Sequence, residues 1–490
     1  MRSVLTRTRT PTGEHDAPRR WLLPAGLGLF AVALGLYVIY TVIHPKSFTM
    51  DPVDLAVYRS GGLIVRHVRP LYDPRLAAPL YDWIGYGKLH LPFTYTPFAA
   101  IAFAVISFVP WWLSQQLSVA VDILALLVAL WLTLGGLGYR KDKTRLAVTL
   151  LGAAAVLWTE PVLRTMYLGQ VNLVLMALII WDLCQPDTDK SRWWKGFGTG
   201  IAAGIKLVPL IFIPYLLLAR KFRQAVMACA GFAFTVLLGF AILPADSRTW
   251  WFDGLFFQGG RTGFTGWAGN QSLDGLITRL TGSISGARPA WIAAAVVVGA
   301  VGVTAAALLD RKGYPVPGLL MAALTGLLVS PISWDHHWVW IAPGALVAAH
   351  YAVQAFKGRA WRRHAKRTAW ALGILAAGIV AWFGAWPARL FTHKLNLGND
   401  SLGLLWIPRN TNPVYYQWYG DKRWFTEYHW HALALIAGNA YVLAGLALFG
   451  LLGALALLLP HQTKGHDDEP GPAGARTQGS LRGRLRLPAA

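Results

Sequence analysis

The sequence has few charged residues. Asp, Glu, Lys and Arg make up only 14% of its 490 residues, whereas a soluble domain carries about 25%. Hydrophobic residues reach 55%, and the mean hydropathy is +0.42. They occur in long blocks, and residues 21–43 contain no charge at all. Because about 20 apolar residues cross a bilayer, the composition excludes an ordinary soluble enzyme and predicts an all-α polytopic membrane protein.

Cysteine and nucleotide-binding motifs are also scarce. Only Cys184 and Cys229 are present, both at or within predicted spans, so we expect packing residues rather than a disulfide framework or a zinc site. The sequence contains no P-loop, no GxGxxG fingerprint, no HExxH motif and no GxSxG elbow. These absences disfavour a cytosolic nucleotide as donor. Since no acidic metal cluster is present either, we expect no metal and no cofactor.

Acidic residues are outnumbered, with 23 Asp and Glu against 45 Lys and Arg, which gives a formal charge of +22. Such an excess can indicate nucleic-acid binding. The basic residues, however, cluster in short stretches between apolar blocks, as in 138–145, 190–195 and 357–367. This pattern is typical of cytoplasmic loops of membrane proteins. We therefore expect membrane lipids, and no nucleic acid, among its partners.

The charge pattern predicts a topology with both termini in the cytoplasm. Residues 1–20 form a basic tail, 21–460 a membrane domain, and 461–490 a disordered tail. About 11–12 transmembrane or re-entrant helices are expected in the cell membrane, at 21–43, 98–110, 111–136, 146–158, 170–184, 196–219, 224–243, 289–309, 316–332, 338–355, 369–388 and 432–459. Three extracytoplasmic loops are expected at 44–97, 244–288 and 389–430.

Segment 196–219 is flanked by basic clusters at both ends. Both ends are therefore expected in the cytoplasm, which a single span does not allow. We predict a hairpin of two short helices that turns near Lys206 and Pro209. Each half is too short to cross the bilayer, so the turn is expected to lie in a protein-lined cavity.

Under this topology, the unusual polar motifs all lie at or near the outer membrane face. This convergence predicts one outward-facing site. The motifs are DPVDLAVYRSGG (51–62), LPFTYTPF (91–98), TEPVLRTMYLGQVN (159–172), GIKLVP (204–209), GNQSLDG (269–275) and SPISWDHHWVW (330–340).

Asp54 has two interpretations. Asp51 can cap a helix, Pro52 suits its first position, and Asp54 then favours the helix dipole. Alternatively, Asp54 is a catalytic acid. The helix that follows has apolar residues at helical spacing, and we expect it on the membrane surface. There the carboxylate could face a lipid-borne substrate.

His336 and His337 are adjacent, so on a helix they point about 100° apart and are unsuited to binding one metal together. A histidine can donate a hydrogen bond or transfer a proton near neutral pH. The alternative is an interfacial aromatic belt, for which Trp334, Trp338 and Trp340 are suited.

Lys206 near membrane depth needs a partner such as a phosphate, unless its ammonium extends to the interface. Arg164 is a weaker candidate for the same role. Glu160, Gln170 and Asn172 precede or begin an expected helix. They can bind sugar hydroxyls or satisfy a broken helix end.

Taken in order, these motifs resemble glycosyltransferase family 87, over residues 50–355. The likeness is strongest to its polyprenol-phosphate-mannose-dependent α-(1→2)-mannosyltransferases. It implies a GT-C fold and a polyprenyl-phosphate sugar donor used on the outer face. It also implies that Asp54 matches the essential family acid, and that His336 and His337 form a pocket pair. One departure is Thr96, where a second proline is expected.

The resemblance implies transfer of mannose to a phosphatidylinositol mannoside, lipomannan or related glycolipid, forming an α-(1→2) linkage with inversion. Asp54 is then the general base, and Lys206, Arg164, His336 and His337 bind the donor phosphate or leaving group. Sugar- or acceptor-binding roles are expected for Tyr58, Tyr95, Glu160, Gln170, Asn172, Asn270, Gln271, Trp334 and Asp335. The alternatives are a polyprenyl-phosphate-arabinose-dependent arabinofuranosyltransferase and a flippase or transporter of lipid-linked sugars.

Overall fold

The computed structural model describes residues 20–43, 52–67, 69–73, 75, 91–185, 193–258, 261, 263–357, 363–384 and 432–462. Nearly all of both predicted tails, and the whole predicted loop 389–430, lie outside these residues. Within the described ranges the chain is helical, and its β-structure is limited to two isolated bridges, Thr159 with Gly384 and Asn270 with Trp334. The predicted all-α class is confirmed.

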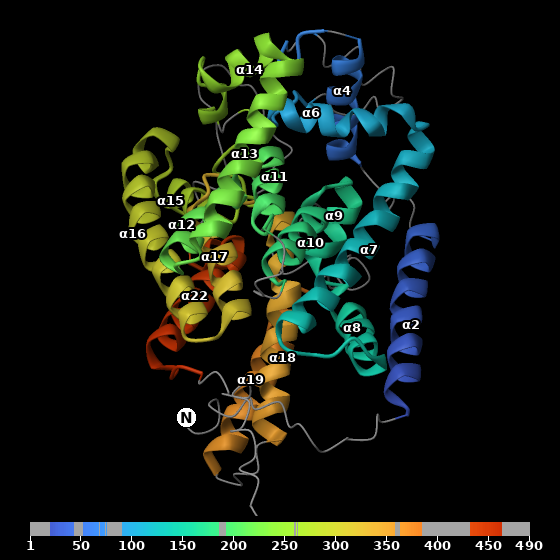
Figure 1. Ribbon diagram of the computed structural model, residues 1–490, viewed down its shortest axis with the longest axis vertical. Helices are drawn as coiled ribbons and strands as arrows, with labels where there is room; N and C mark the ends of the chain where they lie inside the picture. Colours follow the sequence, from blue (N-terminus) through green and yellow to red (C-terminus); the bar gives the residue numbers. More distant parts are fainter. Residues whose placement is uncertain are drawn as a thin grey trace, which may run out of the picture.

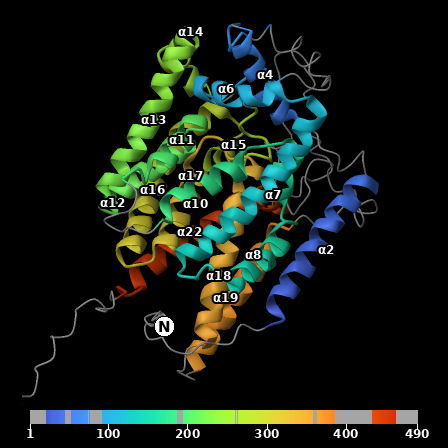
Figure 2. The same cartoon turned by 45° about the vertical axis from the view of Figure 1, so that its right-hand side comes forward.

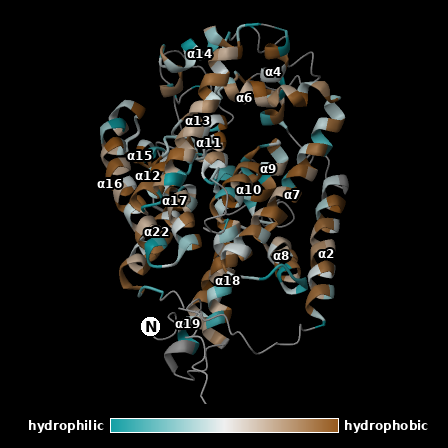
Figure 3. Ribbon diagram, viewed as in Figure 1, coloured by the Kyte–Doolittle hydropathy of each residue, from teal (hydrophilic) through white to brown (hydrophobic). Residues whose placement is uncertain are grey.

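Six helical segments of the described residues are long and apolar enough to cross a membrane. Figure 1 shows most of them running roughly along the long axis of the protein, and Figure 3 shows that most of their residues are hydrophobic. Helix α7 has the bounds predicted from the sequence. The six are α2 (Leu22–Ile43), α7 (Trp111–Gly136), α13 (Phe222–Ile242), α16 (Ile284–Arg311), the segment of η6 (Asp335–Trp340) with α18 (Ile341–Lys357), and α22 (Ala440–Leu458).

Other helices differ from the predicted spans in their bounds. Helix α8 (Lys143–Val156) has 14 residues and begins before the predicted 146–158, and α17 (Pro315–Val329) has 15 and ends before the predicted 332. Each is about 21–23 Å long and does not cross a ~30 Å core as a straight span. Helix α19 (Arg363–Trp382) begins before the predicted 369–388. The predicted span 432–459 is divided between α21 (Ala432–Gly438) and α22.

A sharp bend separates α9 (Glu160–Leu168) from α10 (Asn172–Leu183), which meet at 116°. Gly169 ends α9 with φ +68°, a left-handed conformation that glycine adopts without a Cβ clash. The polar segment here was recognised in the sequence, but α9 was not predicted. The bend leaves residues 169–171 outside both helices, inside the protein.

The predicted hairpin in 196–219 is confirmed. It consists of α11 (Phe197–Ile205), η3 (Val208–Ile211) and α12 (Phe212–Leu218). Gly196 lies against Gln224 and Gly204 against Thr235, so α11 and α13 run in the same direction. The chain must therefore return between them, and it turns at Lys206, where the backbone becomes extended.

A cap of short helices covers one end of the long helices, at the top of Figures 1 and 2. It contains α4 (Val53–Arg66), α6 (Pro97–Phe103), η2 (Ala104–Phe108), α14 (Pro244–Trp251) and η4 (Leu255–Phe257). Helices α14 and α15 (Leu273–Thr281) both fall in the predicted loop 244–288, because short helices give no clear pattern in the sequence.

The expectation that α4 lies on the membrane surface was wrong. Nine of its residues are buried in the cap, against α6 and η2. A Cβ on Gly61 would lie 2.4 Å from the Phe93 ring, and one on Gly62 would lie 2.7 Å from the Phe103 carbonyl oxygen. Close packing at these two glycines holds both sides of α4 inside the protein. The first turn of α4, with Asp54, lies near Lys206 at the turn of the hairpin.

Candidate active site

Asp54 lies in the first turn of α4, whose N-cap is Pro52; Asp51 lies outside the described residues. The half-buried Asp54 carboxylate makes no capping hydrogen bond, and no described residue donates a hydrogen bond to it. It lies within electrostatic range of Tyr58, Tyr95 and Lys206. The cap therefore holds a carboxylate with free oxygens beside a cation.

A chain of hydrogen bonds joins four segments of the protein beneath this carboxylate. The Tyr58 hydroxyl lies 3.1 Å from the Tyr95 hydroxyl and donates to Oε1 of Gln170 at 2.5 Å. The Lys206 ammonium donates to the same Gln170 oxygen at 2.8 Å and to Oδ1 of Asn172 at 2.7 Å. These five residues, with Asp54, are called the Asp54 network below. The sequence predicted each as a site residue, but did not predict their pairing.

Two broken helices place this network. The bend after Gly169 turns Gln170 and Asn172 toward the hairpin, and the end of α11 presents Lys206. The Thr96 hydroxyl donates to the Gly204 carbonyl and caps α6 by accepting from the backbone of Ala99 at 3.1 Å. The departure from the family pattern at position 96 therefore ties the Tyr95 segment to the turn that carries Lys206.

The two tyrosines remain protonated over a wide pH range. Burial raises the pKa of Tyr58 well above its usual value, and Tyr95 and Asp54 raise it further. Burial also raises the pKa of Tyr95. The Lys206 ammonium lies 5.6 Å from the Tyr95 ring centroid, at cation–π distance. Both hydroxyls therefore act as neutral hydrogen-bonding groups.

The histidine segment is attached to the bend between α9 and α10. The carbonyl oxygen of His336 accepts from Asn172 Nδ2 at 2.9 Å and from the Thr165 hydroxyl at 3.1 Å. Asp335 Oδ1 accepts from the His336 backbone at 2.7 Å and lies 3.0 Å from His336 Nδ1. Its other oxygen lies 3.5 Å from Arg164 Nε. Thr165 belongs to this cluster but was not predicted from the sequence, because nothing local marks a threonine as a partner of a distant carbonyl.

The two imidazoles differ in their surroundings. His336 is buried, and its Nε2 has no hydrogen-bond partner among the described residues. His337 is half-buried, and its ring lies 4.8 Å from that of His336 in a T-shaped arrangement. It also lies within electrostatic range of Lys206. Through Asn172 and His337, the histidine pair joins the Asp54 network.

Asn270 and Gln271 were predicted to bind sugar or acceptor, but in the structure their side chains bind backbone groups and have a structural role. Both are fully buried. Asn270 Nδ2 donates to the carbonyls of Thr265 at 2.9 Å and Pro331 at 3.1 Å. Gln271 Nε2 donates to the Gly438 carbonyl at 2.8 Å. Their amide groups are occupied by backbone, so they hold loops together.

Glu160 is likewise fully buried and accepts a hydrogen bond from the Tyr441 hydroxyl. It therefore joins α9 to the last helix, outside the Asp54 network. Trp334 is half-buried and contacts Trp267, with 5.6 Å between ring centroids. Among the described residues, no three His, Cys, Asp or Glu side chains are grouped to hold a metal ion.

A second layer supports the Tyr95 segment. The Tyr72 hydroxyl donates to the Tyr95 carbonyl at 2.8 Å, and Arg261 donates to the Phe93 carbonyl at 3.1 Å. The Arg261 guanidinium lies 5.5 Å from the Tyr72 ring centroid. Two separate segments, those of Tyr72 and Arg261, thus hold the backbone that presents Tyr95 to the network.

Comparison with known proteins agrees with the resemblance inferred from the motifs. The model of glycosyltransferase family 87 matches residues 93–331. The polyprenol-phosphate-mannose-dependent alpha-(1-2)-phosphatidylinositol mannoside mannosyltransferase of Mycobacterium tuberculosis is 34% identical over 341 residues, which cover 67% of this chain and 74% of that protein. The protein of the same name from Mycolicibacterium smegmatis is 30% identical over 437 residues, 85% of this chain and 87% of its own length.

A third relative is the M. tuberculosis polyprenol-phosphate-mannose-dependent alpha-(1-2)-phosphatidylinositol pentamannoside mannosyltransferase, 33% identical over 353 residues. These cover 70% of this chain and 78% of the relative. No solved structure gives a significant match. By these similarities, and by its all-helical polytopic GT-C-type architecture, the chain belongs to glycosyltransferase family 87.

Proposed function

We propose that this chain transfers mannose from polyprenyl-phosphate mannose to a phosphatidylinositol mannoside or a related envelope glycolipid. The donor and acceptor named for its relatives support this assignment. The observation that carries it in the structure is the Asp54 carboxylate, which has no described hydrogen-bond donor and lies within electrostatic range of the Lys206 ammonium. A base and a cation side by side suit displacement of a phosphate by a hydroxyl.

In the proposed reaction, Asp54 accepts the proton of an acceptor hydroxyl, which we assign to the 2-position of a mannose. The hydroxyl oxygen forms a bond to the anomeric carbon of the donor mannose as the bond from that carbon to the phosphate oxygen breaks. The bonding electrons leave with the polyprenyl phosphate. A single displacement on a β-linked donor inverts the anomeric centre and gives an α linkage.

Lys206 is assigned to the departing phosphate. Its ammonium is held between Gln170 and Asn172 by hydrogen bonds of 2.8 and 2.7 Å, so it is preorganised before negative charge develops. His337, within electrostatic range of Lys206, is assigned to the same group. Arg164 acts through Asp335, which orients His336 toward the donor.

We further propose that the cap faces the extracytoplasmic side of the plasma membrane and that both termini are cytoplasmic. The basic stretches 138–145 and 220–223 join membrane helices, whereas the described cap residues carry the site. Short loops rich in Lys and Arg are retained in the cytoplasm. The donor phosphate would then be bound at the outer face.

The test is label transfer by purified protein in nanodiscs, with polyprenyl-phosphate mannose and a mixed phosphatidylinositol mannoside pool. We expect wild type to form labelled glycolipid and Asp54→Asn to lose at least about 100-fold in rate, because general base catalysis contributes about 10²–10⁴-fold. Asp73→Asn is the matched control, since Asp73 is a cap carboxylate paired with Arg75 at 2.7 Å.

Three outcomes would contradict the proposal. A folded Asp54→Asn protein with full activity would remove the base assignment. Transfer from polyprenyl-phosphate arabinose but not from the mannose donor would indicate the arabinofuranosyltransferase. Movement of donor lipid between leaflets without a new glycosidic bond would indicate a flippase.

A further inference from the structure

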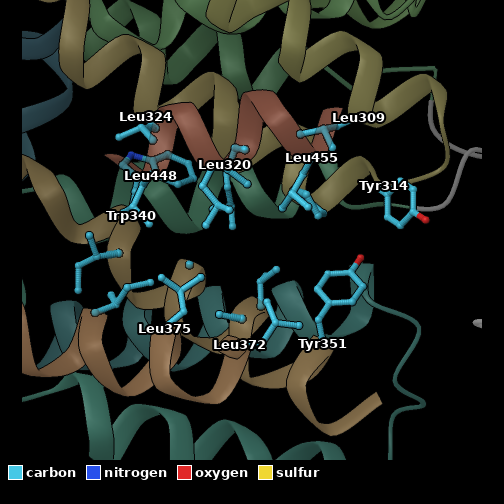
Figure 4. A pocket seen from close by; sticks show the side chains of 18 of the residues that line it. Leu309, Tyr314, Leu320, Leu324, Trp340, Tyr351, Leu372, Leu375, Leu448 and Leu455 are labelled. Atoms are coloured by element: carbon cyan, nitrogen blue, oxygen red, sulfur yellow. The ribbon is translucent and has the colours of Figure 1, made fainter. Parts of the chain in front are cut away.

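An apolar cleft of about 580 Å³ lies between α17, α18, α19 and α22. Figure 4 shows leucine side chains from facing helices lining it on both sides. It shares no lining residue with the Asp54 network or the histidine pair. The transfer reaction proposed above therefore leaves this cleft without a role.

The polar groups of the cleft are gathered at one end. Apart from two tryptophan indoles, its polar lining residues are Tyr314, Tyr351, Arg367 and Thr368. Tyr314 precedes α17, Tyr351 lies near the end of α18, and the other two lie in the first turns of α19. Figure 4 shows Tyr314 and Tyr351 at one end and Trp340 at the other. The cleft is thus polar at its mouth and apolar along its length.

Its length can be taken from the helices that form its walls. The lining of α19 extends from Arg367 to Ile379, and that of α22 with its C-cap from Leu448 to Leu459. At 1.5 Å per residue these stretches are about 18 Å and about 17 Å long. Half of a ~30 Å hydrocarbon core is about 15 Å, so the cleft has the length of one acyl chain of a single leaflet.

The mouth is positively charged. Arg367 is exposed, and neither its guanidinium nor the Tyr351 hydroxyl has a hydrogen-bond partner among the described residues. Arg311 and Lys312, at the end of α16, lie two or three residues before Tyr314. A guanidinium binds a phosphate through two parallel hydrogen bonds. This end therefore complements an anionic head group.

We propose that the cleft binds one acyl chain of an anionic phospholipid, with the phosphate at Arg367 and Tyr351 and the chain directed toward Trp338 and Trp340. The isoprenoid chain of the sugar donor is the rival occupant. An isoprenoid chain would place hydrocarbon beside Arg367 and the Tyr351 hydroxyl, and would give neither group a hydrogen-bond partner. Charge complementarity at the mouth therefore favours the phospholipid.

The bound lipid would contact the element that carries the histidine pair. Trp338 and Trp340 belong to η6, directly after His337, and both line the cleft. Trp340 also packs on Phe212 of α12, with 5.9 Å between ring centroids. An acyl chain in the cleft would thus pack against η6 on the side opposite to the catalytic site. The rate of sugar transfer would then depend on the lipid composition of the membrane.

The experiment uses full-length protein in nanodiscs and a photoreactive phosphatidylglycerol with a diazirine on one acyl chain. We expect labelled peptides from α19 and α22, and displacement of the label by unlabelled phosphatidylglycerol in preference to phosphatidylcholine. Leu452→Trp fills part of the cleft and should lower labelling about tenfold, because the larger side chain occupies the space of the acyl chain. Arg367→Gln should remove the preference for the anionic lipid.

Leu457→Trp is the matched control, because Leu457 lies on the same helix, is 74% exposed and does not line the cleft. If Leu452→Trp does not fold, Leu372→Phe on the facing wall makes the same test. Displacement by polyprenyl phosphate at lower concentration than by phosphatidylglycerol would overturn the proposal in favour of the donor chain. Equal displacement by both phospholipids, or labelling unchanged by the filled cleft, would also overturn it. None of these readouts depends on sugar transfer.

Discussion

Nδ1 of His336 lies 3.0 Å from Oδ1 of Asp335, and the backbone N–H of His336 donates to that same oxygen at 2.7 Å. The arrangement fixes both the position of the ring and the nitrogen that carries its proton, as carboxylates beside histidines do in other sites. Arg164, 3.5 Å from the other Asp335 oxygen, holds the carboxylate in turn. His336 therefore presents Nε2 in a defined state.

We predict that Asp335→Asn lowers the transfer rate about 10–100-fold, because a hydrogen bond to a charged group contributes about 1.5–3 kcal/mol. The loss should appear in kcat more than in the donor KM. In NMR spectra of ¹⁵N-histidine-labelled protein, the ring nitrogen shifts of His336 should show a change of tautomer. Asp274→Asn is the control, since that buried carboxylate lies outside the histidine cluster and accepts from the Thr278 hydroxyl at 3.3 Å. An unchanged rate together with an unchanged tautomer would refute the orienting role.

Lys206→Met should raise the donor KM about 10–100-fold, because it removes a charged donor from the proposed phosphate site. Lys206→Arg should restore part of the loss. The comparison is Lys195→Met, which removes a buried ammonium that donates to the Gln185 carbonyl at 2.6 Å, outside the Asp54 network. Equal effects of the two methionine variants on KM would show that the Lys206 effect is a general loss of stability.

Gly200→Ala should lower the free energy of unfolding by about 1–3 kcal/mol, as overpacking does. A Cβ at Gly200 would lie 2.2 Å from the Ala228 carbonyl oxygen, so α11 could not keep its distance from α13. Gly373→Ala is the matched control, because its added Cβ would have no neighbour within 4 Å. A melting temperature equal to wild type for Gly200→Ala would show that the helix pair is looser than described.

The proposed orientation can be checked with single cysteines in a Cys184→Ala, Cys229→Ala background. Arg69 is an exposed cap residue and Arg140 an exposed residue of a basic loop. Arg69→Cys should react with a membrane-impermeant maleimide on intact cells, and Arg140→Cys only after permeabilisation. The reverse pattern would invert the topology.

Much of the membrane scaffold could be predicted from the sequence, because a charge-free apolar run has few alternatives to a membrane helix. The bounds of α7 were obtained from such a run, which is interrupted only by Asp122, and the hairpin at Lys206 from the basic clusters at both ends of its segment. The 116° bend after Gly169 was not, because it depends on how α9 and α10 pack rather than on their composition. Helices α14 and α15 are too short to produce a clear pattern.

The site residues were identified from local polar motifs, but their roles depend on distant partners. Lys206 bonds Gln170 and Asn172, which are 36 and 34 residues earlier. Gln271 looked like a pocket residue until Gly438, 167 residues later, proved to occupy its amide. Local sequence patterns do not reveal partners so far apart in the chain. The sequence could therefore predict that the polar segments come together, but not which hydrogen bonds they form.

The contact between Tyr441 and Glu160 has a consequence for the order in which the protein is made. A membrane chain is inserted from its N-terminus, and domains generally fold as they are synthesised. Glu160 is therefore synthesised 281 residues before its partner Tyr441, and Gln271 is synthesised 167 residues before Gly438. The earlier helices can be inserted, but the walls of the site lock only when the last helix arrives. A nascent chain stalled before α22 would carry every catalytic residue and still lack a finished site.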